Sequence, residues 1–229
     1  MTLRFDLLRT VGILFLICVC VPASADSVVT ADGGDIVLTQ GSRKIHLTSA
    51  HADRDPVQSP DGRVVVFTRG QTDDGEGNCV ASFDREAGLW TVDVASGKAK
   101  MLAHAQSSNR PDGQLCGFTD KQFSSDGRRL YFSTPGWATS GALWVYDFAK
   151  AKPSFLLPSN GFVVLAKCQD PDFRDKLVVS QHRYFVFGGS YDWYWLFGPK
   201  GGKDLGPVGD TPDPARDACD MAIGKDQQK

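Results

Sequence analysis

Short apolar segments alternate with turn-forming residues along most of this chain. Residues 55–58 and 64–68 are two strand-like segments, the second rich in β-branched side chains, and Pro60-Asp61-Gly62 stands between them. Two such segments joined by a tight turn predict a β-hairpin. The pattern recurs at residues 121–133, so that Ser59 and Ser124 are 65 positions apart. The chain therefore contains an internal repeat.

Each copy of the hairpin is followed by two more strand-like segments. A Leu-Trp segment that ends in an acidic residue comes first, at residues 88–93 and again at 142–147. A segment that combines basic or polar with apolar residues closes each unit, at 100–102 and 153–157. Four short strands per repeated unit are typical of a β-propeller blade.

The repeated motif also resembles that of a known family. Ser-Pro-Asp-Gly at 59–62 followed by Val-Val-Val-Phe-Thr, its Ser-Ser-Asp-Gly copy at 124–127, and Ile-His-Leu-Thr at 45–48 resemble the WD40-like (PD40) repeats of TolB-type β-propellers. The resemblance implies an all-β fold, a partial or small propeller of about three and a half four-stranded antiparallel blades. A divergent third unit is expected at 163–209. The segments 35–39 and 44–48 are expected to supply the outer two strands of an incomplete blade.

The number of blades separates this chain from the family. A closed ring of six blades needs on the order of 250 residues, more than this chain provides. Either the ring closes with few blades, or a partner or a second copy completes it. Open strand edges near residues 35–38 and 203–205 are then expected to pair with each other, with the tail or with another chain. Self-association through these edges is one expected outcome.

The N-terminus has the pattern of a secretory signal. Arg4 and Arg9 precede an apolar run at 11–21, and Ala23-Ser24-Ala25 fits a signal peptidase site. The prediction is a signal peptide at 1–25, propeller repeats at 26–209 and a C-terminal tail at 210–229. The apolar run is too short to span a bilayer, and the mature protein is expected in the periplasm or outside the cell. The alternative, lipidation, is disfavoured because Ile17 and Val19 precede the two cysteines of this segment, where a small residue is needed.

Composition and charge exclude one class of partner. The chain has 25 basic and 27 acidic residues, a net charge of -2, so it has no strong field to attract nucleic acid. Its 24 glycines and 12 prolines agree with many turns. No later segment is apolar enough to cross a membrane. The expected partner is another periplasmic or envelope protein.

Four cysteines remain after signal cleavage, Cys79, Cys116, Cys168 and Cys219. Four thiols allow three full pairings, and no Cys-x-x-Cys spacing supports zinc or thioredoxin-type chemistry. In the blade pattern implied by the resemblance, the insertions at 72–86 and 106–119 emerge on the same face. A bond between Cys79 and Cys116 is therefore expected, and one between Cys168 and Cys219 would hold the tail; the alternative is that one pair remains as free thiols.

Candidate chemistry is sparse. The sequence has no Gly-x-Ser-x-Gly elbow, P-loop or dinucleotide fingerprint, so we expect no catalytic residue, no cofactor and no metal. His51, Asp53 and Asp55 offer an imidazole and two carboxylates on the face of the insertions. They are candidate ligand- or partner-binding residues, and the alternative function is a metal-dependent binder or hydrolase that uses this face. An aspartate in this position can equally satisfy loop amides.

Aromatic residues gather near the C-terminal end of the repeats. Eight of the chain's 24 aromatic residues lie within residues 184–197. Alternation along a strand places Trp193, Trp195 and Phe197 on one face. Either this strand is buried between blades, or Trp193 and Trp195 form an aromatic platform for a partner or a sugar. Taken together, the sequence predicts an exported, non-enzymatic scaffold or protein-binding module.

Overall fold

The computed structural model describes residues 27–74, 79 and 84–225. The predicted signal peptide, residues 1–25, lies outside the described residues. The described chain forms strands and, near its C-terminal end, one α-helix, α1 (Asp213–Lys225). In this part of the chain, no helix is long and apolar enough to cross a bilayer.

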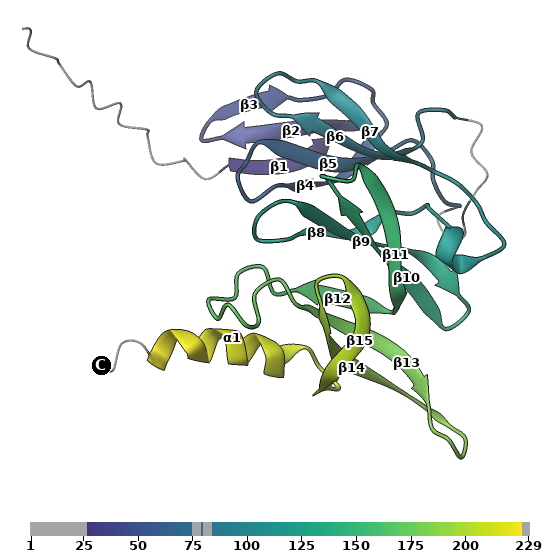
Figure 1. The fold of residues 1–229 in the computed structure, drawn as a ribbon. Coiled ribbons are helices and arrows are strands. Elements are labelled where there is room, and N and C mark those ends of the chain that lie inside the picture. The colour runs from purple at the N-terminus through teal and green to yellow at the C-terminus, as the bar shows by residue number, and fades with distance from the viewer. Residues whose placement is uncertain (1–26, 75–78, 80–83, 226–229) are drawn as a thin grey trace, which may run out of the picture.

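The strands form four antiparallel sheets that follow one another along the chain (Figure 1). The first sheet has three strands, β1 (Ser27–Asp32), β2 (Asp35–Gln40) and β3 (Arg43–His46). The second has four, β4 (Asp53–Gln58), β5 (Val64–Arg69), β6 (Gly88–Asp93) and β7 (Ala99–His104). The third consists of β8 (Thr119–Phe123), β9 (Arg129–Trp137), β10 (Ser140–Asp147) and β11 (Lys152–Ser159), after a short 3-10 helix at Pro111–Gly113. The fourth consists of β12 (Gly161–Val164), β13 (Leu177–Tyr184), β14 (Ser190–Gly198) and β15 (Gly201–Gly209).

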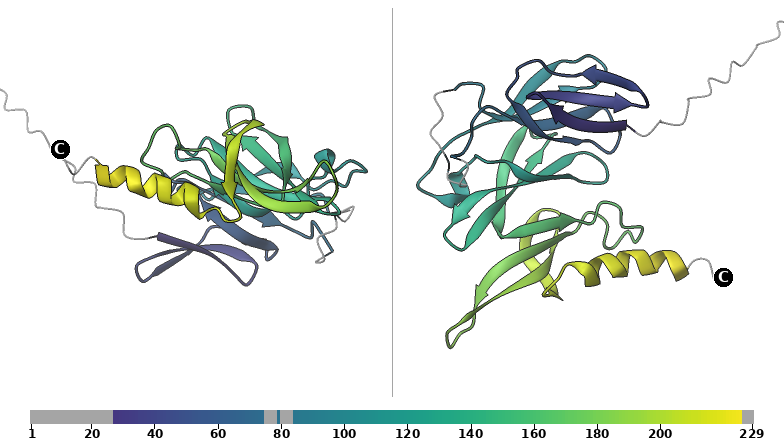
Figure 2. Two further views of the ribbon diagram at one scale, coloured as in Figure 1. Left: turned by 90° about the horizontal axis from the view of Figure 1, so that it is seen from below. Right: turned by 180° about the vertical axis from the view of Figure 1, so that it is seen from behind.

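The sheets are stacked as blades of an open arc. Within each sheet the strands are neighbours in chain order, and the first strands of the last three sheets, β4, β8 and β12, contact one another in turn. These three strands form the inner side of the arc. The first and the last sheet lie at opposite ends of the stack (Figure 2). The expectation of a partial all-β propeller of about three and a half blades is confirmed.

The two repeated turns have the same hydrogen bonds. The amide of Gly62 donates to the carbonyl of Ser59 at 2.9 Å, and that of Gly127 donates to the carbonyl of Ser124 at the same distance. Each serine hydroxyl also lies within 2.7 Å of the aspartate two positions later. Both glycines have positive φ, 72° and 67°, a conformation that costs glycine little because it has no Cβ. The two copies of the repeat therefore share the hydrogen bonds and the backbone conformation of this turn.

Three apolar layers join the four sheets. Val65 and Phe67 of β5 are fully buried against the first sheet, and Val66 on the opposite face of the same strand is buried against the third. Side chains also alternate between two faces along β9 of the third sheet. Leu130 and Phe132 face the second sheet, and Tyr131 faces the fourth. A strand buried on both faces needs a continuous apolar run, which explains why these segments lack the polar alternation of a one-sided sheet.

The helix α1 covers the far face of the last sheet. Ala215 and Cys219 of the helix pack with Val178 of β13 and Leu165, all of them buried. A disulfide between Cys168 and Cys219 ties the helix to this face. Figure 2 shows α1 lying along the last sheet, at the end of the arc where a closed ring would continue. The helix α1 thus covers the face of the last sheet on which the next blade of a closed ring would pack.

Two expectations about the ends of the arc need correction. The first sheet has three strands, not the outer two alone, because the β-branched segment at Ser27–Asp32 pairs along its whole length with β2. The tail does not pair as a strand with a terminal edge; it forms a helix that packs through side chains. Asp213 and Pro214 begin that helix, and both residue types favour a helix N-terminus. Self-association through open edges stays a prediction.

Candidate binding surfaces

A groove runs along the inner side of the arc. Two adjoining cavities of about 450 and 420 Å³ share Val57 of β4 and Lys121 of β8. The larger one continues to the inner strand of the last sheet and to α1, and has the mostly apolar lining of a ligand site. The smaller one is polar. The lining of the larger cavity includes Val57, Phe123, Val163, Leu165, Lys167 and Arg216, and that of the smaller includes Asp55, Thr119, Asp120 and Lys121.

Lys121 is the partly buried cation of this groove. Its ammonium group donates a hydrogen bond to the carbonyl of Phe118. Burial lowers the pKa of Lys121 to about 8, with a smaller opposing influence from the Asp55 carboxylate and a smaller reinforcing one from Arg54. An anionic group that approached this lysine would favour its charged form and raise its pKa again.

Two aspartates flank the lysine in equivalent positions of the repeat. Asp55 and Asp120 each lie four residues before the repeated serine, and both have positive φ, 51° and 50°. At both places the strand shifts register against its neighbour, between Arg54 and Val57 and between Thr119 and Gln122. Positive φ in a residue with a Cβ is uncommon. In each of two successive blades, the bulge therefore turns an equivalent carboxylate, that of Asp55 or Asp120, toward the groove.

Gln122 bridges the inner strands of the last two sheets. Its side-chain amide donates to the carbonyl of Phe162 at 3.0 Å, and its carbonyl oxygen accepts from the amide of Val164 at 2.9 Å. The side chain thus satisfies the free edge of β12 as a neighbouring strand would. This bridge fixes the groove wall between the two blades.

The histidine and the aspartates proposed from the sequence serve separate partners. Asp53 is buried and forms a two-pronged ion pair with Arg69. The imidazole of His51 lies 3.1 Å from a carboxylate oxygen of Asp35, while Asp55 lies in the groove. In the described residues, no three histidine, cysteine or acidic side chains come together as a metal site.

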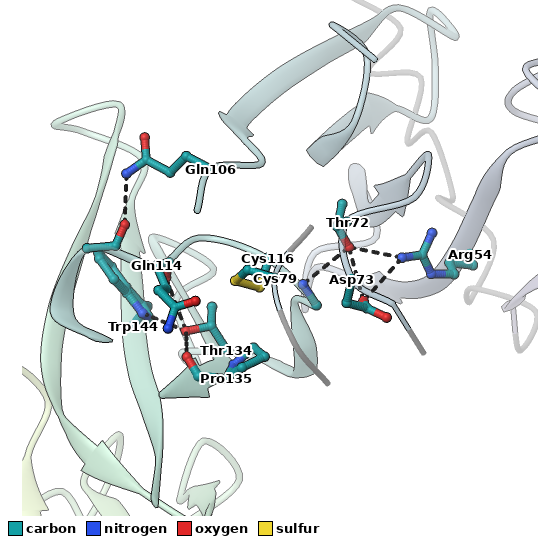
Figure 3. The surroundings of a disulfide bond; sticks show 12 residues. Arg54, Thr72, Asp73, Cys79, Gln106, Gln114, Cys116, Thr134, Pro135 and Trp144 are labelled. Atoms are coloured by element: carbon teal, nitrogen blue, oxygen red, sulfur yellow. Dashed lines mark hydrogen bonds and ion pairs between the residues drawn. A yellow bond between two sulfur atoms is a disulfide. The ribbon is translucent and has the colours of Figure 1, made fainter. Parts of the chain in front are cut away.

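The two insertions meet through the disulfide between Cys79 and Cys116 (Figure 3). Beside it, the hydroxyl of Thr72 accepts hydrogen bonds from the amide of Gly117 at 3.2 Å and from Arg54 at 3.0 Å. Arg54 also lies 3.8 Å from the carboxylate of Asp73. Both cysteine pairs agree with the pairing expected from the sequence. The loops are therefore tied to each other and to the start of β4.

A two-stranded ribbon projects from the last sheet. β12 pairs only with Leu177–Ser180 of β13, and β15 reaches along β14 only to Tyr194. Beyond these points Gln181–Tyr184 pairs with Ser190–Trp193 alone. Figure 1 shows this hairpin extending away from the arc on the side opposite to the free end of α1.

The projecting ribbon carries an aromatic surface. Trp193 is 43% exposed, whereas Phe197 farther along the same strand is buried, so the strand is a core element at one end and a surface element at the other. The ring centres of Phe185 and Tyr191 lie 4.6 Å apart, and those of Tyr191 and Trp193 lie 5.9 Å apart. Trp195, at the base, carries the guanidinium of Arg183 over its ring at 3.5 Å.

Sequence reasoning did not identify Lys121, Asp120 or Gln122 as site residues. Asp55 and Asp120 could have been matched by aligning the two repeats on Ser59 and Ser124. The partial burial of Lys121 had no local signal, because it depends on the neighbouring sheet.

The comparisons concern the fold. No family profile and no curated protein sequence matches this chain. Similar solved structures include TolB from Acinetobacter baumannii, with 17% identity over 77% of this chain and 38% of that chain and a TM-score of 0.47. A putative TolB from Agrobacterium tumefaciens has 17% identity over 77% and 59%, with a TM-score of 0.45. The β-propeller domain of the Trilobed protease from Pyrococcus furiosus has 15% identity over 78% and 52%, with a TM-score of 0.44. This chain spans less than two thirds of each of these proteins, and its similarity to them is that of a partial β-propeller.

Proposed function

We propose that this chain is an exported, non-enzymatic scaffold that binds an extended segment of another periplasmic or envelope protein in its inner groove. The observation that carries the proposal is the continuity of the two inner cavities, which share Val57 and Lys121 and cross the inner strands of three blades. A groove that is long, half apolar and half charged suits a peptide chain, which presents side chains of both kinds.

The charges of the groove favour a partner segment with a defined direction. Lys167 and Arg216 line the apolar end, and Asp55 and Asp120 line the other end. The acidic end of a bound segment would lie beside the two cations, and its basic end would lie beside the two aspartates. The apolar side chains between them would bury the middle of the segment, where most of the affinity of such contacts arises.

Two disulfides support the exported location, because such bonds persist in oxidising compartments. The shared hydrogen bonds of the turns at Ser59 and Ser124 support a divergent TolB-type repeat. The signal peptide predicted at residues 1–25 agrees with this location.

Site-specific photo-crosslinking in the cell envelope tests the proposal. A photoreactive residue at Lys167, which is exposed and lines the groove, should capture a partner, and one at Thr119 should capture the same partner. The matched control is Lys98, which is exposed in the turn between β6 and β7. Filling the groove with Ala166→Trp should reduce capture from Thr119 about tenfold, equivalent to ~1.4 kcal/mol.

The proposal is wrong if Lys98 captures the same protein as Lys167 with equal yield. It is also wrong if Ala166→Trp, folded as judged by circular dichroism, leaves capture unchanged. A crosslinked partner that is found at Lys167 but not at Thr119 would restrict binding to the apolar cavity and contradict an extended segment.

A further inference from the structure

The exposed apolar side chains of this protein are concentrated in one place. Of the eight large hydrophobic side chains that are exposed in the described residues, five lie in the projecting ribbon, and Val186 and Phe187 at its tip are 93% and 102% exposed. The ribbon tip is defined here as residues 184–191. Surface hydrophobic residues scattered singly are ordinary, but a contiguous group marks a contact with another protein or with a membrane.

The ribbon tip has no charged residue, and the polar side chains behind it have partners. Residues 184–191 read Tyr-Phe-Val-Phe-Gly-Gly-Ser-Tyr. The imidazole of His182 lies 3.0 Å from the carboxylate of Asp192, and the guanidinium of Arg183 lies 3.0 Å from that of Asp204. Arg183 is three residues before Val186, so at about 3.3 Å per strand residue these pairs lie roughly 10 Å behind the outermost side chains of the tip.

We propose that the ribbon tip inserts into the interfacial region of a lipid bilayer and holds the propeller at a membrane surface. An uncharged apolar tip about 10 Å deep matches the roughly 5–10 Å to which peripheral elements enter the boundary between headgroups and acyl chains. Phe185, Val186 and Phe187 would enter the acyl region. Tyr184, Tyr191 and Trp193 would lie among the headgroups, the level at which tyrosine and tryptophan are enriched.

The shape of the tip favours a bilayer over a protein partner. A stable protein interface buries about 800 Å² on each partner and involves some 20–30 residues. The ribbon tip is a narrow convex projection of eight residues, which contributes only a fraction of that area and needs a deep complementary pocket. A bilayer opens around such a projection and needs no preformed pocket. The site is independent of the inner groove and of the function proposed for it.

Contacts between aromatic rings stabilise the projecting ribbon. A two-stranded hairpin is marginally stable by itself, yet the ring contacts of Tyr191 with Phe185 and Trp193 run along its length. These contacts fix the tip in an extended form while its outermost side chains remain in solvent. The tip is thus prepared for insertion without a conformational change.

Flotation with vesicles of phosphatidylcholine, with and without phosphatidylglycerol, tests this proposal. The mature protein should bind both kinds of vesicle with similar affinity, because the tip is uncharged. The double variant Val186→Asp, Phe187→Asp should lose at least tenfold in binding. The matched control, Leu205→Asp, changes an exposed apolar residue of β15 that lies near α1 and should bind as the wild type does. The double variant of the tip should keep the thermal midpoint of the wild type, since both changed side chains are almost fully exposed.

Depth is measured with Phe187→Trp and vesicles whose acyl chains carry bromine. The new tryptophan should be quenched on binding, whereas Leu205→Trp should show no added quenching. The proposal would be overturned if the wild-type protein bound neither kind of vesicle. Equal binding of the Val186→Asp, Phe187→Asp variant would also overturn it, and so would binding only to vesicles with the anionic lipid.

Discussion

The guanidinium of Arg69 holds the buried carboxylate of Asp53 through two hydrogen bonds, Nε at 2.6 Å and Nη2 at 2.9 Å. The side chain of Asp53 is fully buried and that of Arg69 is 12% exposed. The same guanidinium lies 4.4 Å above the ring of Trp90. This pair joins β4, the strand whose Asp55 and Val57 line the groove, to β5.

Asp53→Ala should destabilise the protein by about 3 kcal/mol, because it leaves the largely buried Arg69 guanidinium with only the exposed carboxylate of Glu86, 3.7 Å away, as a charged partner. Chemical denaturation of both proteins at pH 7 measures this loss. The control is Arg110→Ala, which removes an ion pair of similar geometry with Asp112 on the surface. That change should leave the unfolding free energy unaltered. Equal losses for both variants would show that burial of the Asp53 pair is irrelevant.

Gly62→Val should destabilise the protein by at least ~1 kcal/mol through backbone strain. Gly62 has φ of 72°, and a Cβ added there would meet only the Gln58 side chain at 3.5 Å, so the cost lies in the backbone. Gly62→Asn should cost less, since asparagine tolerates this conformation. Thermal unfolding separates the two variants. If asparagine and valine cost the same, positive φ is not the cause.

Lys121→Met should change the pH dependence of stability. Because the pKa of Lys121 falls from about 10.5 to about 8 on folding, the unfolded chain holds this proton between those pH values and the folded protein releases it. The stability of the wild type therefore gains from this group as pH rises from 8, by at most about 1.4 kcal/mol per pH unit.

The free-energy difference between Lys121→Met and wild type should thus favour the variant most near pH 7 and shrink between pH 8 and 10. Measurements should stay below pH 10. Burial raises the pKa of Tyr131 to about 12, so this tyrosine lowers the stability of the folded protein as pH rises above 10. Lys98→Met, an exposed change, should leave the pH profile as it is. A constant difference across pH 7–10 would contradict the lowered pKa.

The double variant Cys168→Ser, Cys219→Ser should release α1 from the last sheet. A cross-link between residues 51 positions apart contributes up to about 4 kcal/mol through the unfolded state. Release of α1 would expose the apolar face around Val178 and Leu165, which is the kind of surface that receives a blade elsewhere in the arc. We expect faster proteolysis of the tail and self-association in light scattering. A monomeric variant with a protected tail would show that side-chain packing alone holds the helix.

The repeated hairpins, the Leu-Trp strands and the divergent third unit were all predictable from the sequence. Each rests on local patterns, a tight turn between β-prone segments or a buried strand, whose physical causes act within a few residues. The start of α1 also has a local signal, the pair Asp213-Pro214. β1 was missed because it directly follows the segment assigned to the signal peptide.

The groove and the ribbon tip depended on the tertiary structure. Lys121 is partly buried by a sheet formed far from it in sequence, and Gln122 bonds a strand 40 residues away. The tip is exposed because β12 and β15 end before β13 and β14 do, so one aromatic segment is core at Phe197 and surface at Phe187. The sequence by itself determined the strands and the repeat, through local turn chemistry and apolar runs. Only the tertiary structure decided which side chains those strands bury, because burial depends on where neighbouring strands end.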